Sequence, residues 1–319
     1  MTLTVSDPRV SAARLSIFSN TALTGAKILA GILTGSVSIL AEAIHSGLDL
    51  AAAVVAYCAI RIATKPRDED HHYGHGKFEN LSGVIEALLI FVAAVWIIWE
   101  SLHKLMHPAV LAHARIGIMV MAVSAGVNIL VSRRLFRVAR EYDSEALRAD
   151  AWHLKTDVYT SLGVFGALVL AWLGGKLFPS ANLQWLDPVC AIGVALLILK
   201  TSYDLTLSAG RDLLDVSLTA NELEKIHAYL DGLIRDRATR FQAGHEPVLG
   251  YHKLRTRKSG PNRFIDLHLE LWPGITLARA KDTCEKVESG ILALFPNASV
   301  TIHPEPAKRK YAPKSSGRC

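Results

Sequence analysis

Long apolar stretches separated by short polar segments occupy the first two thirds of the chain. Between Ser16 and Ile60 only Lys27, Glu42 and Asp49 are charged. A helix that crosses a bilayer needs roughly 20 mostly apolar residues. A soluble bundle with this many long apolar runs would have too little polar surface, so we expect membrane helices. The six predicted spans are residues 12–33, 37–62, 81–105, 114–136, 147–173 and 185–207.

The pattern changes after about residue 215, where charged residues become frequent. A helical stripe is followed by two strand-like segments around a Ser-Gly-Pro-Asn turn, then by a second helix and a last strand. The order α-β-β-α-β predicts a small, metallochaperone-like α+β domain. We expect a transmembrane domain over residues 1–215, a cytoplasmic α+β domain over 216–305 and a basic tail over 306–319. The expected elements are helix 221–240, strands 249–258 and 263–271, helix 276–294 and strand 299–303.

Composition and charge narrow the possible classes of protein. Of 319 residues, 50% are hydrophobic and 20% are charged, which is not typical of a disordered chain or a coiled coil. Four scattered cysteines do not make a disulfide scaffold. The net charge of +6 is read as membrane topology and attraction to lipid, not as nucleic-acid binding. Basic residues concentrate in alternate loops, which predicts that both termini face the cytoplasm. These residues are Arg9, Arg14, Arg61, Lys65, Arg67, Lys77, Arg133, Arg134, Arg137, Arg140 and Arg148.

Two of the predicted spans carry the same ionisable motif. His45 and Asp49 lie in the second span, and His153 and Asp157 lie in the fifth. The i, i+4 spacing places both side chains of each pair on one face of a helix. Ionisable groups inside a membrane are costly and are therefore functional candidates. Two such faces opposed would form a cage of two imidazoles and two carboxylates, a donor set that zinc accepts in a tetrahedron. Mn²⁺ and Mg²⁺ favour oxygen-rich octahedra.

Two segments carry a resemblance to a known family. Residues 35–49, GSVSILAEAIHSGLD, resemble the second-helix motif of the cation diffusion facilitator (CDF) family, and residues 71–79, HHYGHGKFE, resemble the loop that follows it. Six spans and a cytoplasmic α-β-β-α-β domain are also similar, most of all to the bacterial ferrous-iron/zinc efflux branch. The resemblance implies a homodimer in the bacterial inner membrane that exports divalent metal from the cytoplasm in exchange for protons.

The resemblance also implies three sets of metal ligands. The transport site falls on His45, Asp49, His153 and Asp157. The similar branch usually has Asp where this chain has His45, and the version with two histidines is typical of zinc-preferring members. This difference favours zinc over iron or manganese and leaves cadmium open. The other two sets are Asp68, His71 and His75 in the loop, and His252, His268, His303 and Glu305 in the cytoplasmic domain.

Several positions in these sets have alternative interpretations. The loop residues, considered alone, are also typical of a solvated polar loop, and the domain histidines of an ordinary surface. A further family histidine falls on or near Lys281, which puts the second of two paired metals in doubt. Lys77 resembles a lysine that pairs with an acid after the sixth span, here Asp215, in a salt bridge that ties the dimer together; the alternative is a lysine that only follows the positive-inside rule. Residues 235–247 look longer than the corresponding family connection.

The sequence therefore predicts a secondary transporter, not an enzyme: a Zn²⁺/H⁺ antiporter that exports zinc and possibly cadmium. The alternatives are the same fold exporting Fe²⁺ or another divalent metal, and a membrane metal sensor without transport. An intramembrane zinc hydrolase is disfavoured, because no H-E-x-x-H motif is present and four protein ligands would leave no position for water. We find no phosphate-binding G-x-x-x-x-G-K-[ST] loop, so we expect no nucleotide.

Overall fold

The computed structural model describes residues 7–34, 37–106, 114–177, 185–235 and 248–307. The chain divides into two compact units, Met1–Leu213 and Leu214–Cys319. The predicted tail from residue 308 onward and residues 236–247 of the long connection lie outside the described residues.

The described part of the first unit contains six helices of 27 to 33 residues. At a rise of 1.5 Å per residue they are about 40 to 50 Å long, which exceeds the roughly 30 Å hydrocarbon core of a bilayer. Three described stretches are long and apolar enough to cross a membrane: His45–Ala63, Lys77–His103 and Pro188–Leu213. The helices are α1 (Pro8–Thr34), α2 (Val37–Ala63), α3 (Lys77–Met106), α4 (Ala114–Tyr142), α5 (Glu145–Leu177) and α6 (Leu186–Leu213).

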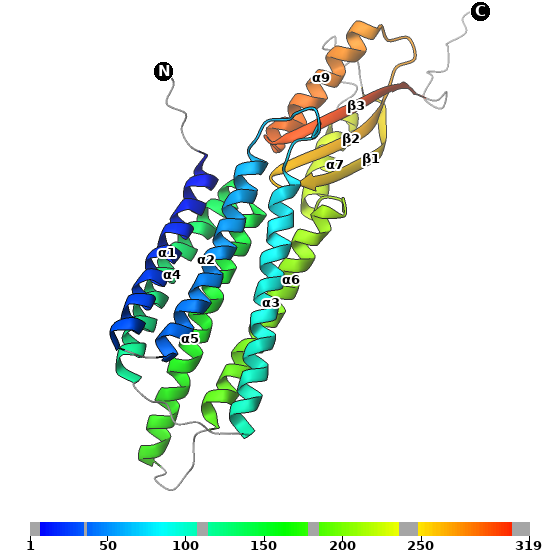
Figure 1. Cartoon of the computed structure of the whole chain (residues 1–319). Coiled ribbons are helices and arrows are strands. Elements are labelled where there is room, and N and C mark those ends of the chain that lie inside the picture. Colours follow the sequence, from blue (N-terminus) through cyan, green and yellow to red (C-terminus); the bar gives the residue numbers. More distant parts are fainter. Residues whose placement is uncertain (1–6, 35–36, 107–113, 178–184, 236–247, 308–319) are drawn as a thin grey trace, which may run out of the picture. The chain divides into compact units, whose positions relative to one another are not determined.

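Helices α1, α2, α4 and α5 pack around one apolar core, and α3 packs along α6 (Figure 1). Small residues such as Ala13, Ala146 and Ala151 are fully buried between helices, so the backbones approach closely. Large apolar side chains point outward instead, among them Phe18 and Val92. Such extensive apolar exposure is unusual for a soluble surface and is expected of helices in contact with lipid.

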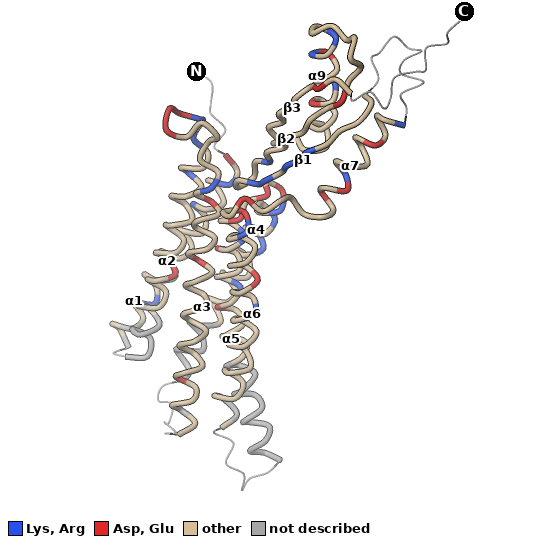
Figure 2. The backbone as a smooth tube through the Cα atoms, turned by 90° about the vertical axis from the view of Figure 1, so that its right-hand side faces the viewer, with Lys and Arg blue, Asp and Glu red and all other residues tan. Residues whose placement is uncertain are grey.

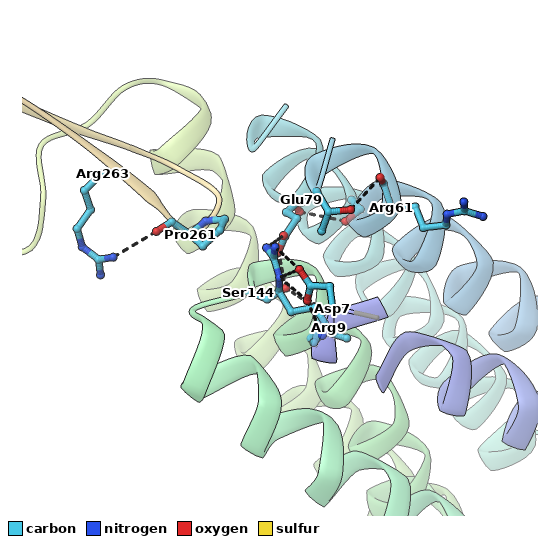
Figure 3. Close-up of polar contacts among 10 residues, drawn as sticks. Asp7, Arg9, Arg61, Glu79, Ser144, Pro261 and Arg263 are labelled. Carbon is cyan, nitrogen blue, oxygen red and sulfur yellow. Dashed lines mark hydrogen bonds and ion pairs between the residues drawn. The ribbon is translucent and has the colours of Figure 1, made fainter. Parts of the chain in front are cut away.

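Charged residues gather at one end of the first unit, near the start of α1, and are sparse along the rest of the helices (Figure 2). At that end Arg9 of α1 binds two acids. Its Nη1 lies 2.6 Å from Glu79 Oε1 of α3, and its Nη2 lies 2.8 Å from Asp7 Oδ2. Glu79 also accepts a hydrogen bond from Ser144, just before α5 (Figure 3). The cluster therefore links the starts of three helices.

The second unit is a three-stranded sheet with two helices. In chain order its elements are α7 (Ala220–Arg235), β1 (Gly250–Ser259), β2 (Asn262–Leu271), α9 (Leu277–Leu294) and β3 (Ala298–Pro306). The sheet order is β1-β2-β3, with β1 antiparallel and β3 parallel to β2. The predicted order α-β-β-α-β is confirmed. The predicted helix over 221–240 ends at Arg235 in the described residues.

From Ile265 to Leu271, strand β2 alternates between a buried apolar face and a polar face. Ile265, Leu267 and Leu269 are buried in one core with residues of α7 and α9, such as Ile226 and Ile291. A period of two residues places the intervening side chains on the opposite face of the sheet. That face carries Asp266, His268 and Glu270. The apolar face therefore fixes the register that presents His268 away from the core.

A capping box begins α7. Thr219 donates from its backbone nitrogen (3.1 Å) and its hydroxyl (2.7 Å) to Glu222 Oε2, and Glu222 N donates to Thr219 Oγ1 at 3.4 Å. Arg263 of β2 donates to Glu222 Oε1 from Nε at 2.8 Å. Burial acts to raise the pKa of Glu222, but the hydrogen bonds from Thr219 and Arg263 outweigh it and hold the pKa below its usual value.

We expect Glu222→Gln to destabilise α7 by about 1 kcal/mol at pH 7, roughly a fivefold increase in amide hydrogen exchange. Because the folded-state pKa is lowered, this stabilisation is present above the ordinary pKa and is lost as the pH falls through the folded-state value. The difference between wild type and variant should therefore shrink below about pH 4.5. Hydrogen exchange of the α7 amides in the full-length protein measures this difference in stability. The control is Glu224→Gln, which replaces an exposed glutamate of the same helix. Equal effects of the two variants would contradict the capping role.

Candidate metal centres

Helices α2 and α5 carry the four predicted ligands of the membrane site. His45 and Asp49 lie one turn apart on α2, and His153 and Asp157 lie one turn apart on α5. The two helices pack against each other in the first unit. Asp49 and His153 are buried, whereas the His45 side chain is half exposed.

The structure brings these side chains together. His153 Nε2 lies 3.0 Å from Asp49 Oδ1, and His45 Nε2 lies 4.0 Å from the same oxygen. Ligand atoms of His45, Asp49 and Asp157 all lie within 4.8 Å of one another. Ligand atoms around a tetrahedral zinc ion are about 3.3 Å apart, so small side-chain movements would close this set on a metal. Among the described residues His153 Nδ1 is buried without a hydrogen-bond partner.

A buried lysine adjoins this cluster. Lys27 of α1 is 4% exposed, and its Nζ donates to Ser46 Oγ at 2.6 Å. Ser46 follows His45 on α2, and Thr24 of α1 donates to its backbone oxygen at 3.0 Å. The ammonium of Lys27 interacts electrostatically with Asp49 and Asp157. A role for Lys27 beside the cluster was not predicted from the sequence. Its charge inside the first apolar run was the available signal.

The loop between α2 and α3 holds the second predicted set. His71 Nδ1 and His75 Nε2 lie 3.2 Å from the two oxygens of Asp68, and the His71 amide donates to Asp68 Oδ1 at 2.7 Å. The two imidazole rings are 4.2 Å apart between centroids. Desolvation acts to raise the pKa of Asp68, but hydrogen bonds from His71 hold it below its usual value. Ligand atoms of all three residues lie within 4.8 Å of one another, and His75 is buried.

The third set lies on the polar face of the sheet. His252 of β1, His268 of β2 and His303 of β3 occupy one row across the three strands. Glu305 contacts the row, because Oε1 lies 2.6 Å from His268 Nδ1 and Oε2 lies 3.3 Å from His252 Nε2. The hydrogen bond from His268 lowers the pKa of Glu305. Ligand atoms of His252, His268 and Glu305 lie within 4.8 Å of one another, and His303 Nε2 is 3.9 Å from Glu305 Oε1.

An irregularity in β1 orients His252. The register shifts between His252 and Arg255, and Lys253 adopts φ 50°, so β1 bulges beside the row of histidines. Glu270 of β2 lies 3.3 Å from His252 Nδ1 through its Oε1. The sequence placed Glu270 on the polar face of its strand but not beside His252, because a bulge changes which side chains meet across the strands.

Two other sequence predictions concern single side chains. Lys281 lies on α9, where its Nζ is 3.5 Å from Glu285 Oε1 on the same exposed face. Lys77 donates to the Leu213 backbone oxygen at 3.4 Å, and Asp215 Oδ1 lies 3.3 Å from Arg257 Nη1. The predicted Lys77–Asp215 salt bridge joins residues of separately described units and stays a prediction.

Comparisons with known proteins identify the family of the chain. A family model described as the cation efflux transmembrane domain matches residues 13–214. A second, named ZT_dimer and described as the cytoplasmic domain of the cation efflux protein, matches residues 230–307. The chain belongs to the cation diffusion facilitator family. The predicted fold class, a helical transmembrane domain followed by a cytoplasmic α+β domain, is thereby confirmed.

Individual relatives extend over most of the chain. An uncharacterized transporter, sll1263, of Synechocystis sp. is 36% identical over 92% of this chain and 88% of its own length. The cation-efflux pump FieF of Cronobacter sakazakii is 33% identical over 88% of this chain and 87% of its own. A solved structure titled as that of a putative zinc transporter CzrB in its Zn form is 30% identical, covers 30% of this chain and 97% of its own, and has a TM-score of 0.25.

Family membership establishes the general activity of the chain. It is a membrane protein and a cation efflux transporter of divalent metal ions.

Proposed function

We propose that the chain exports Zn²⁺ from the cytoplasm in exchange for protons and that His45, Asp49, His153 and Asp157 hold the transported ion. The observation that carries the proposal is the convergence of His45, Asp49 and Asp157 within 4.8 Å, with His153 hydrogen-bonded to Asp49. Two nitrogen and two carboxylate donors suit the tetrahedral coordination of zinc. The same donors accept Cd²⁺, whereas the harder Mn²⁺ prefers oxygen ligands.

Protons are the proposed counter-ion. His153 Nε2 is hydrogen-bonded to Asp49 Oδ1, so the nitrogen and the oxygen that would bind the metal contact each other in its place. In the proposed proton-loaded state the imidazole of His153 is protonated on both nitrogens, and its Nε2 proton faces Asp49. A metal that binds the same nitrogen and oxygen displaces that proton, since ligands must be deprotonated to coordinate a metal. Protons arriving from the opposite side of the membrane would reverse the exchange and release the metal there.

The proposed assembly is a homodimer in a bacterial inner membrane with both termini in the cytoplasm. The name of the dimer-domain model over residues 230–307 and the bacterial relatives support it. The row of His252, His268 and His303 with Glu305 supports a zinc site in the cytoplasmic domain. Asp68, His71 and His75 form a proposed third, cytoplasmic loop site.

Proton release on zinc binding tests the exchange. We expect the membrane site to release about one proton per zinc ion near pH 7, because zinc replaces the proton between His153 and Asp49. Titration calorimetry in buffers of different ionisation enthalpy measures the number of protons released. The protein carries Asp68→Ala and His268→Ala so that the membrane site is followed alone, and Asp157→Ala in the same background is the control. Zinc binding without proton release would contradict the exchange.

A further inference from the structure

Helix α3 carries a carboxyl group deep inside the first unit. Glu86 has no exposed surface, and neither of its carboxyl oxygens has a hydrogen-bond partner among the described residues. An ionised carboxylate buried without a partner is strongly disfavoured. The group is therefore held either with a bound cation or as the neutral acid.

Close helix packing places Glu86 beside α5. Gly83 lies one turn earlier on α3, where a Cβ atom would be 3.3 Å from Ala209 Cβ of α6 and 3.7 Å from the Glu145 backbone oxygen of α5. The next residue, Ala87, faces α6, because its backbone oxygen accepts a hydrogen bond from Ser202 Oγ at 2.7 Å. The backbones of three helices thus converge one turn from the buried carboxyl.

Asp150 of α5 is the acid that interacts electrostatically with Glu86. It is 1% exposed, and its Oδ2 is also without a hydrogen-bond partner among the described residues. From α1, the Ser16 side chain interacts with Asp150, and one turn further along that helix lies Asn20. Both are buried, and Ser16 Oγ and Asn20 Nδ2 make no hydrogen bond of normal geometry within the described part of the chain. Three helices therefore contribute unpaired polar groups to the interior.

The other charged side chains on the neighbouring helices are engaged or exposed. On α3 itself Glu79 binds Arg9 of α1, Lys77 donates to the Leu213 backbone oxygen, and Glu100 and His103 lie about 20 Å or more along the helix from Glu86. On α5 Arg148 binds Glu145, and His153 and Asp157 belong to the metal cluster, from which His153 also interacts electrostatically with Asp150. The remaining described groups on α1, α2, α5 and α6 fall into three sets. Lys27 bonds to Ser46, Lys155 lies over Trp152, and Asp212 accepts from Asn80. His45 and Asp49 are in the metal cluster, and the exposed groups are Arg14, Arg61, Lys200, Asp204 and Arg211.

We propose that the two buried carboxyl groups of Glu86 and Asp150, which are not among the metal ligands, form a proton-binding site inside the helical unit and hold one proton between them. A shared proton removes one of two facing negative charges and provides a donor for an unpaired oxygen. A divalent metal is less suited, because two carboxyls offer too few ligands. The proposal rests on the proton exchange proposed above and adds a second place for a proton.

The position of the pair relative to the metal cluster gives it a role in the exchange. Asp150 precedes His153 by three residues and Asp157 by seven on the same helix, which is about 5 and 10 Å along the axis. When one proton has returned to the emptied metal cluster, a second proton that enters through it has a nearby carboxyl to occupy before it leaves toward the cytoplasm, so the pair adds one proton per zinc. No bond other than the O–H bond forms or breaks, and the proton ends in cytoplasmic water.

Glu86→Gln tests the site, because glutamine has the shape of the protonated acid and cannot release a proton. Zinc and proton fluxes are recorded together in proteoliposomes with a zinc dye and a pH dye. We expect the variant to carry one proton fewer per zinc and its acid-driven zinc flux to fall at least about tenfold. Its zinc affinity should change less than about threefold, because the metal ligands are intact. Glu79→Gln removes an equally buried but paired carboxylate on the same helix, and its proton count should match that of wild type.

Infrared spectroscopy tests the site independently of transport. Wild-type protein at neutral pH should show the carbonyl band of a protonated carboxylic acid, and Glu86→Gln should lack it. Absence of this band in wild type, an unchanged proton count in Glu86→Gln, or the loss of one bound zinc instead of one proton would each overturn the inference. Wild type that shows no proton-driven zinc flux at all would overturn the proposed exchange itself, and the inference with it.

Discussion

Asp49→Asn is expected to lower zinc flux by about 100-fold or more while the fold stays intact. Asp49 of α2 joins the two helices of the cluster, because its Oδ1 lies 3.0 Å from His153 Nε2 of α5 and 4.0 Å from His45 Nε2 of its own helix. Asparagine keeps the shape of the side chain but loses the charge that a divalent ion and a protonated imidazole both require. Initial rates of zinc uptake into proteoliposomes measure the loss.

Asp204→Asn is the matched control for this variant. Asp204 lies on α6, is exposed, and is not one of the residues that converge in the cluster. Its flux should stay within about twofold of wild type, as is usual for a substitution away from the site. A similar loss in both variants would mean that charge in the membrane helices matters in general, and not the position of Asp49.

Zinc is expected to stabilise the dimer of the cytoplasmic domain strongly, and His252→Ala combined with His268→Ala should abolish this effect. A ligand that binds only the folded assembly stabilises it by about 4 kcal/mol at a thousand times its dissociation constant. The two histidines and Glu305 form the compact part of the cluster, so their removal leaves one predicted ligand in the row, His303, together with Glu305. Mass measurement in detergent, with and without a chelator, reports the dimer fraction.

His227→Phe provides the comparison within the same domain. His227 of α7 bonds to the Tyr251 hydroxyl at 2.8 Å and does not belong to the cluster. This variant should lose some stability but keep the full response to zinc. If the double variant also kept that response, the cluster would not be a zinc site.

Much of the fold follows from periodicity in the sequence. The six apolar runs predicted the helices to within about two turns, since lipid and helix packing both select apolar residues over a fixed length. Alternation over residues 263–271 predicted which side of β2 is buried. The two His-x-x-x-Asp motifs predicted the partners in the membrane cluster, because i, i+4 spacing fixes a helical face whatever the tertiary packing.

The features that were not predicted from the sequence depend on tertiary contacts between helices and between strands. The contact of Glu270 with His252 arises from the bulge at Lys253, for which the local sequence holds no Gly or Pro signal. In the sequence Glu86 is a single acid in a long apolar run, and its interaction with Asp150 depends on the packing of α3 against α5, which approach closely at Gly83. Such pairings are set by tertiary contacts between segments distant in the sequence.

Metal flux under an imposed pH gradient tests the central claim most directly. Acid-loaded proteoliposomes should take up Zn²⁺ and lose protons together, and Asp157→Ala should do neither, since Asp157 supplies one of the converging ligand atoms. Cd²⁺ flux should follow that of zinc, and Fe²⁺ and Mn²⁺ fluxes should be smaller. Zinc flux that ignores the gradient, or Mn²⁺ or Fe²⁺ flux equal to that of zinc, would contradict the account.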